Sequence, residues 1–113
     1  MIQERRKFER IQLPLGARAY VTTPDGKKLG SLTVLGRGGF QVETKQKFNP
    51  GEAYNFVIVD ESEGIKRGVW ALPRMVTPEA VGFEFESLEA DAAVEVGVII
   101  GKYYSAAQEA QDK

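Results

Sequence analysis

Short apolar runs, separated by turn signals at regular intervals, constrain this sequence most. Several runs alternate apolar and polar residues, which is the pattern of a strand with one buried face. The intervening clusters are rich in the glycine, proline, asparagine and aspartate that turns require. The runs cover residues 17–22, 29–35, 40–43, 54–59, 65–76 and 81–86. About six short strands at this spacing predict a small all-β barrel or sandwich.

Three of the turns and one strand carry specific expectations. Thr23-Pro24-Asp25-Gly26 and Asn49-Pro50-Gly51 predict tight turns, and Thr77-Pro78-Glu79 predicts a third. The polar segment Asp60-Glu61-Ser62-Glu63-Gly64 is expected to be a solvated loop. Pro73 donates no ladder hydrogen bond, so its part of the long strand is expected at an edge or a bulge.

The C-terminal region changes from strand to helix periodicity. After Ser87, which we predict to be the N-cap, apolar residues recur at three- and four-residue steps as far as Ala107. The resulting helix either covers one end of the barrel or joins two copies in a homodimer. Gly97 and Gly101 share one face, where a neighbouring backbone can approach closely. The polar tail from Gln108 is expected to fray.

Composition excludes several classes of function. The chain has 113 residues, enough for one core, and a formal net charge of -1, so a general attraction to DNA, RNA or membranes is unsupported. It contains neither cysteine nor histidine, which removes thiolate metal sites and the commonest general base. We therefore expect no enzyme, no metal and no cofactor. The charged residues 1–10 do not resemble a signal peptide, so a cytoplasmic location is expected.

Two basic or glycine-rich segments remain as candidate binding sites. Arg5, Arg6 and Arg10 crowd the N-terminus, and such charge is most often simply solvated. Gly36-Arg37-Gly38-Gly39 is followed by a predicted strand, so it is neither a P-loop nor a dinucleotide fingerprint, and taken alone it predicts a tight turn.

The order of these features resembles the PilZ family. The matching segments span nearly the whole chain and are Glu4-Arg5-Arg6-Lys7-Phe8-Glu9-Arg10-Ile11, Arg37-Gly38-Gly39-Phe40 and Val81-Gly82-Phe83-Glu84-Phe85. The resemblance implies a mainly-β fold: a six-stranded antiparallel, PilZ-like split β-barrel with one C-terminal α-helix. It places a flexible basic segment at residues 1–12 and the barrel with its helix at residues 13–110. It also implies a bacterial receptor for the second messenger cyclic di-GMP.

The resemblance assigns the ligand contacts to two segments. Arg6 and Arg10 are implied to grip guanine and phosphate, with Arg5 assisting, because the planar guanidinium fork suits both groups. Backbone N–H groups of Gly36, Gly38 and Gly39 are expected to form an anion-binding concavity, and Arg37 is expected to add charge nearby.

The family's second motif, D/N-x-S-x-x-G, is degenerate here. Counting back from Gly39, the acid or amide is replaced by Val34 and the serine by Gly36. In the family those side chains hydrogen-bond the guanine base. Losing two such bonds at about 1–2 kcal/mol each weakens binding by roughly 30- to 1000-fold.

Two hypotheses about function follow. In the first, the domain binds cyclic di-GMP through its arginines and relays occupancy to an unidentified effector protein. In the second, the nucleotide site is lost and the barrel is a protein-interaction adaptor related to motility or pili. Trp70 is expected to pack in the core, or alternatively to be partly exposed near a binding face. Of Tyr103 and Tyr104, one is expected to face the barrel.

Overall fold

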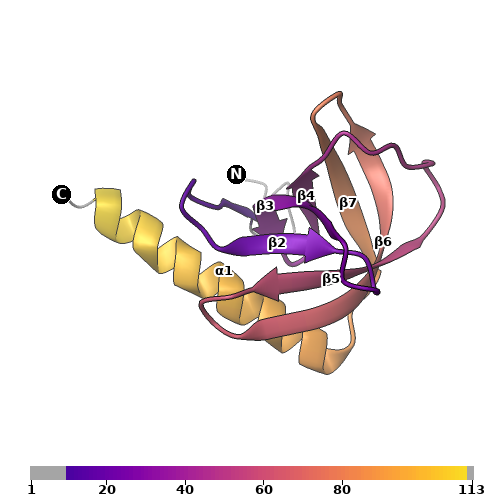
Figure 1. Ribbon diagram of the computed structural model, residues 1–113. Coiled ribbons are helices and arrows are strands. Elements are labelled where there is room, and N and C mark those ends of the chain that lie inside the picture. The colour runs from indigo at the N-terminus through magenta and orange to yellow at the C-terminus, as the bar shows by residue number, and fades with distance from the viewer. Residues whose placement is uncertain (1–9, 112–113) are drawn as a thin grey trace, which may run out of the picture.

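The computed structural model describes residues 10–111, and side chains through Ser105. Within that range the chain forms seven strands and one helix, in the arrangement of Figure 1. They are β1 (Arg10–Gln12), β2 (Ala19–Thr22), β3 (Lys28–Gly36), β4 (Gly39–Glu43), β5 (Tyr54–Asp60), β6 (Ile65–Val76), β7 (Ala80–Ser87) and α1 (Ala90–Gln111). Strands β2 to β7 match the six predicted runs, and the predicted fold class is confirmed.

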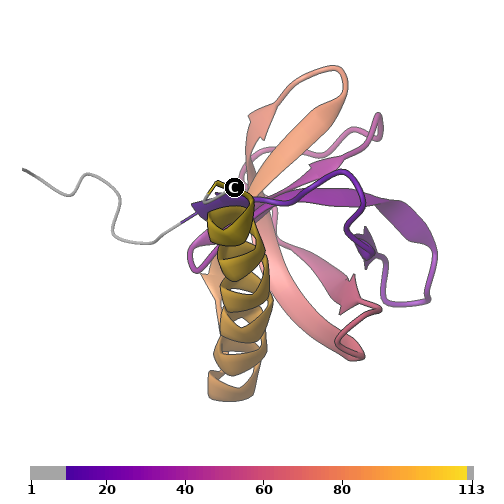
Figure 2. The same cartoon turned by 90° about the vertical axis from the view of Figure 1, so that its left-hand side faces the viewer.

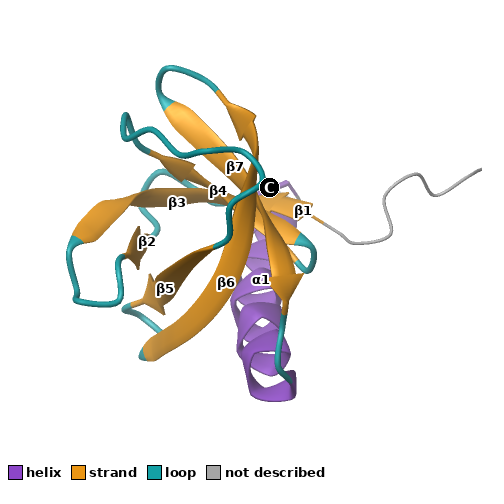
Figure 3. Cartoon of the chain, turned by 90° about the vertical axis from the view of Figure 1, so that its right-hand side faces the viewer, coloured by secondary structure: helices purple, strands orange, loops and turns teal. Residues whose placement is uncertain are grey.

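The sheet closes into a barrel because β4 pairs on both of its edges. Its antiparallel neighbours are β7 and β3, and these pairings complete the ring β3-β2-β5-β6-β7-β4. β1 lies outside this ring and pairs with the end of β3, which sets Arg10 opposite Gly36. The seventh strand therefore comes from residues 10–12, the last three of the segment that we expected to precede the barrel. Figure 3 shows the strands curving around a common interior, with α1 beside them.

Pro73 lies where the sheet tolerates it. β5 pairs with β6 only as far as Ala71, so beyond that point β6 has β7 as its partner on one edge. The β6–β7 register also shifts between Pro73 and Met75, which marks a bulge. Pro73 has no N–H group, but here β6 has no strand of residues 10–111 on its other edge, so no second ladder of hydrogen bonds is interrupted, as predicted. The predicted turns are present as well, with positive φ at Gly26 and Gly51.

Phenylalanines form a contacting cluster within the barrel interior. On β7, Val81, Phe83 and Phe85 are buried and alternate with outward residues, as the sequence predicts. Phe83 stacks on Phe40 with ring centroids 5.1 Å apart. Phe48, from the connection between β4 and β5, adds an edge-to-face contact to Phe83 at 5.3 Å. A loop residue thus supplies part of the core.

Helix α1 buries one face against the barrel. Val96, Ile99, Ile100 and Tyr103 belong to the same hydrophobic cluster as the strand residues, which confirms the predicted covering role. Figure 1 and Figure 2 show α1 and the β6–β7 turn at opposite ends of the molecule.

Both ends of α1 differ from our expectation. The helix begins at Ala90, so the predicted N-cap at Ser87 is wrong: Ser87 is the last residue of β7 and pairs with Trp70. The helix also continues to Gln111, although the tail was expected to fray from Gln108.

A buried carboxylate anchors α1 to the end of β5. Asp60 has no exposed surface, which contradicts its assignment to a solvated loop. Its Oδ1 accepts hydrogen bonds from the Ser62 N–H at 3.0 Å and the Ser62 hydroxyl at 2.8 Å, and Lys102 Nζ lies 3.5 Å away. The second oxygen, Oδ2, is buried without a hydrogen-bond partner. Burial disfavours the Lys102 ammonium, but Asp60 and Tyr103 outweigh this effect and raise the pKa of Lys102 above its usual 10.5.

We expect Gly39→Ala to destabilise the barrel by roughly 1–3 kcal/mol, the usual range for forcing an extra methyl into filled space. A Cβ on Gly39 would lie 2.1 Å from the Phe83 carbonyl oxygen, so the backbone of β4 or β7 has to move. Gly82→Ala is the matched control, because its Cβ would lie 3.6 Å from the Met75 side chain, an ordinary contact. Urea unfolding measures both variants, and equal loss in the two would contradict the close-approach explanation.

We expect Lys102→Met to lower the free energy of unfolding by about 1–3 kcal/mol, because Asp60 then keeps a buried carboxylate without its cation. Since the pKa of Lys102 is raised, its contribution is complete below pH 10.5 and is lost only above it, so unfolding at neutral pH is informative. Arg18→Met is the control: it breaks the exposed 3.3 Å pair with Glu61, which contributes at most about 1 kcal/mol. Adding Asp60→Asn to Lys102→Met should restore part of the loss, and no recovery would argue against the buried-charge explanation.

Candidate ligand-binding site

An open cavity of about 320 Å³ lies on the outer face of the sheet, where β1, β3, β4, β7 and β6 run side by side. Glycines line it from three strands and one turn, namely Gly36, Gly38, Gly39 and Gly82. Arg10 borders this floor on the β1 side, and Arg74 with Glu84 borders it on the β6–β7 side. Because glycine has no side chain, a flat ligand can approach the backbone closely here.

Strand register brings these residues together. Residues that are directly opposite in neighbouring strands project from the same face of a sheet. Arg10 is opposite Gly36, and Val34 is opposite Gln41. Gln41 is in turn opposite Gly82, and Gly39 is opposite Glu84. The residues that alternate with them along the same strands are buried in the core, so the core pattern places this row of residues on the outer face.

Arg10 is the predicted arginine that the structure places at the cavity. It is exposed, and no ion pair among the residues of the described range, 10–111, involves it. Its guanidinium is therefore not neutralised by a carboxylate in this part of the chain. Arg5 and Arg6 lie outside the described residues.

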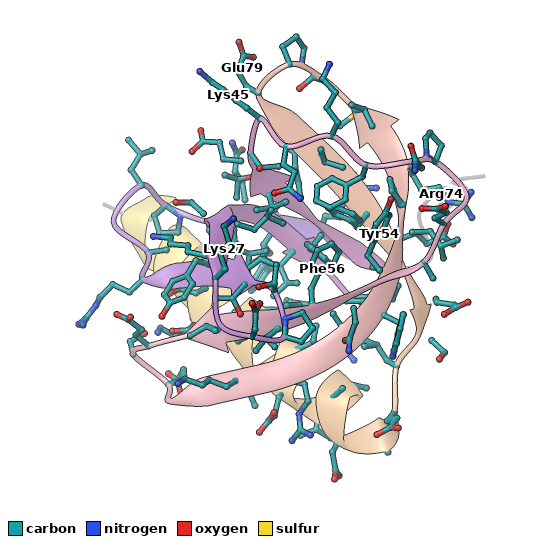
Figure 4. The ribbon with its side chains drawn as sticks, turned by 45° about the vertical axis from the view of Figure 1, so that its right-hand side comes forward. Lys27, Lys45, Tyr54, Phe56, Arg74 and Glu79 are labelled. Atoms are coloured by element: carbon teal, nitrogen blue, oxygen red, sulfur yellow. The ribbon has the colours of Figure 1, made fainter. Side chains whose placement is uncertain are left out.

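Arg74 and Glu84 are cavity residues that the sequence analysis missed. Arg74 Nε donates to Glu84 Oε1 at 2.5 Å, and both side chains are about half exposed. Figure 4 shows Arg74 on the outside of the barrel, whereas Phe56 lies in its interior. Alternation along β6 and β7 predicts that both side chains point outward, but sequence alone does not show that the two strands meet at these positions.

The glycine-rich segment is only partly what the resemblance implies. Gly36, Gly38 and Gly39 line the cavity, but Arg37 does not. A Cβ on Gly97 would lie 3.7 Å from Arg37 Nη2, so this guanidinium rests on α1. A side chain, rather than a backbone, thus approaches Gly97, and nothing lies within 4 Å of the corresponding point on Gly101.

The backbone of this segment does not have the alternating form of an anion nest. In the described part of the chain, the glycines with positive φ are Gly26, Gly51 and Gly64. None of them belongs to residues 36–39, so the left-handed residue of a nest is absent there. The Gly38 carbonyl instead accepts a hydrogen bond from the Phe85 N–H at 2.9 Å, which ties the turn to β7. The expected backbone concavity is therefore not a nest of this form, and its binding of an anion stays a prediction.

Three aromatic residues singled out from the sequence differ in how exposed they are. Trp70 is 51% exposed, so the core-packing interpretation is wrong and its partial exposure is confirmed, while its place near a binding face stays a prediction. It lies on the outer face of β6, four residues before Arg74. Tyr103 is buried and Tyr104 is half-exposed, which confirms that one of the pair faces the barrel.

A serine and a lysine are in contact where α1 packs near the β5–β6 connection. The Ser62 hydroxyl accepts a hydrogen bond from Lys102 Nζ and donates one to Asp60. Despite the opposing effect of burial, Asp60 and Tyr103 raise the pKa of Lys102, which favours the protonated amine beside Ser62.

Residues 10–111 contain no cluster of three or more acidic side chains arranged to bind a metal ion. Within the same range, no helix combines the length and the hydrophobicity needed to cross a bilayer.

Neither a protein-family model nor a curated protein matches this sequence. Solved structures do match the fold. The PilZ domain of YcgR from Escherichia coli, solved with c-di-GMP, has a TM-score of 0.73 and 22% identity, covering 97% of this chain and 99% of that one. YcgR from Escherichia coli in complex with c-di-GMP has a TM-score of 0.75 and 18% identity, covering 96% of this chain and 50% of that one. The uncharacterized Legionella protein Lpg0364 has a TM-score of 0.63 and 10% identity, covering 88% of this chain and 98% of that one.

At this level of identity the likeness concerns the fold. The similarity of fold agrees with the resemblance to the PilZ family. That resemblance rested on the arginine segment, the glycine turn and the G-F-E-F strand. The closed barrel, its outer strand and the C-terminal helix therefore have the fold of these PilZ structures.

Proposed function

We propose that this domain is a receptor module for cyclic di-GMP, which it binds in the cavity between Arg10 and the Arg74–Glu84 pair. The observation that carries the proposal is an arginine without a carboxylate partner in the described range, at the edge of a glycine-lined cavity. The solved YcgR structures with this fold were obtained with the same nucleotide, which supports the choice of ligand. We place this receptor in the cytoplasm and propose that it binds without catalysis.

Arg10 and Arg6 carry the phosphate contacts in this proposal, with Arg5 in support. Pairing of β1 with β3 holds the Arg10 backbone beside Gly36, at the rim of the cavity. Arg6 precedes Arg10 by four residues and Arg5 by five. Guanidinium groups bind phosphate oxygens bidentately, and they also stack on purines.

The relay to an effector protein would run through α1. The β3–β4 turn contributes Gly38 to the cavity, while its other residue, Arg37, rests on α1 at Gly97. One turn therefore contacts both the cavity and the helix. The helix carries Val94 and Val98 on its exposed side, 65% and 45% accessible, where an effector or a second copy of the chain would bind.

The adaptor hypothesis remains the second candidate, and one observation favours it. Trp70 is large, apolar and half-exposed, which is the character of an anchor residue in a protein interface. In that hypothesis the domain binds a protein partner of the motility or pilus machinery and no nucleotide.

We expect calorimetric titration with cyclic di-GMP to give saturable binding, with a dissociation constant between the micromolar and millimolar ranges. Arg10→Ala and Arg6→Ala should each weaken binding by about 10- to 100-fold, because each removes charge-assisted hydrogen bonds. Arg18→Ala is the control, since Arg18 pairs with Glu61 and does not line the cavity. If no heat is measured at near-millimolar nucleotide, the receptor proposal is wrong and the adaptor hypothesis remains. Binding that depends on the arginines would exclude an adaptor without a nucleotide site.

Binding should also weaken as the salt concentration rises. The proposed contacts join guanidinium groups to phosphates, and salt screens such interactions over about 10 Å at 0.1 M. Titrations at 50 mM and 500 mM sodium chloride measure the effect. An affinity that does not change between them would contradict an ionic mode of binding.

A further inference from the structure

Among the described residues, the carboxylate that lines the cavity is Glu84, and its position suits a base rather than a phosphate. Glu84 projects from β7 on the same outer face as Gly39, its cross-strand partner. An ionised carboxylate only accepts hydrogen bonds, and it repels phosphate oxygens. A site for a doubly negative ligand gains nothing from this group unless the group contacts a part of the ligand that carries N–H donors.

Guanine presents such donors and adenine does not present them in the same arrangement. On its Watson–Crick edge, guanine offers N1–H and the N2 amino group side by side, which match the two oxygens of a carboxylate. Adenine offers an acceptor at N1 and a donor only at N6. A site built around a carboxylate therefore distinguishes the two bases, because adenine does not offer the carboxylate oxygens the paired N–H donors of guanine.

Arg74 makes a carboxylate tolerable in an anion site. Its 2.5 Å contact with Glu84 leaves the pair with no net charge, so the cavity keeps the positive charge of Arg10 for the phosphates. The contact uses Nε and Oε1, whereas a carboxylate has about four acceptor positions. Glu84 can thus accept from a base while Arg74 still orients it.

The separation across the cavity fits a ligand with phosphates between two bases. Arg10 is on β1 and Glu84 is on β7, with β3 and β4 between them. Three strand spacings of about 4.8 Å place the two strands about 14 Å apart along the sheet. The glycines Gly36 and Gly39 lie between them and leave the surface open.

We propose that Glu84 is a specificity-determining residue, which reads the Watson–Crick edge of one guanine and selects cyclic di-GMP over cyclic di-AMP, with Arg74 as its positioning residue. This inference rests on the proposed function. It assigns base recognition to β7, across the cavity from Val34 and Gly36.

The test compares cyclic di-GMP and cyclic di-AMP by calorimetry on the wild-type chain, Glu84→Gln and Glu86→Gln. Glu86 is exposed on the same face of the same strand but does not line the cavity, so it is the matched control. We expect Glu84→Gln to lose about 10- to 100-fold in affinity for cyclic di-GMP, with little change for cyclic di-AMP, because the amide places a donor against a guanine donor. Glu86→Gln should bind both nucleotides as the wild type does.

The outcomes separate the two levels of the proposal. Unchanged cyclic di-GMP affinity in Glu84→Gln overturns the role of Glu84 and leaves the receptor function in place. Equal loss for both nucleotides also overturns it, because Glu84 would then only maintain the cavity. No binding of cyclic di-GMP to the wild type overturns the receptor function and the inference together. Urea unfolding of the three proteins checks that the losses do not reflect instability.

Discussion

The structure depends on closing the ring through β4, which has five residues and must pair on both edges. Two glycines permit this. A Cβ on Gly39 would lie 2.1 Å from the Phe83 carbonyl oxygen, and one on Gly30 would lie 1.7 Å from that of Glu43. The barrel thus closes only where neighbouring backbones approach more closely than any side chain permits. The same closure sets β3, β4 and β7 side by side and so creates the cavity.

This constraint changes the meaning of the glycine-rich segment. From sequence, Gly39 is the surviving residue of a ligand motif, whereas the structure gives it a reason to be glycine that involves no ligand. The Gly38 carbonyl is likewise committed to the Phe85 N–H. The charges that define the candidate site lie instead at its two borders, Arg10 on β1 and the Arg74–Glu84 pair on β6 and β7.

Periodicity predicted the strands because inward and outward residues alternate along each of them, as on β7. It could not predict β1, because three residues such as Arg10–Gln12 carry no readable period and acquire strand geometry only by pairing with β3. The Arg74–Glu84 contact could not be predicted from the sequence for a related reason. The partners lie ten positions apart on two strands joined by a turn, and the register between these strands is set by bulges near Pro73. Asp60 was misjudged because its buried carboxylate is paired with Lys102 of α1, a contact 42 residues away in the sequence.

The outer face of a barrel allows a binding site to move between strands. Core positions such as Phe83 are constrained on every side by packing, so their replacement destabilises the fold. Outward positions such as Val34, Gln41 and Glu84 share one surface but contribute little to that core. A polar group can therefore be lost from β3 and supplied by β4 or β7 without disturbing the barrel, provided that it reaches the same space. A motif read along one strand misses such a substitution, because the ligand meets the surface across strands.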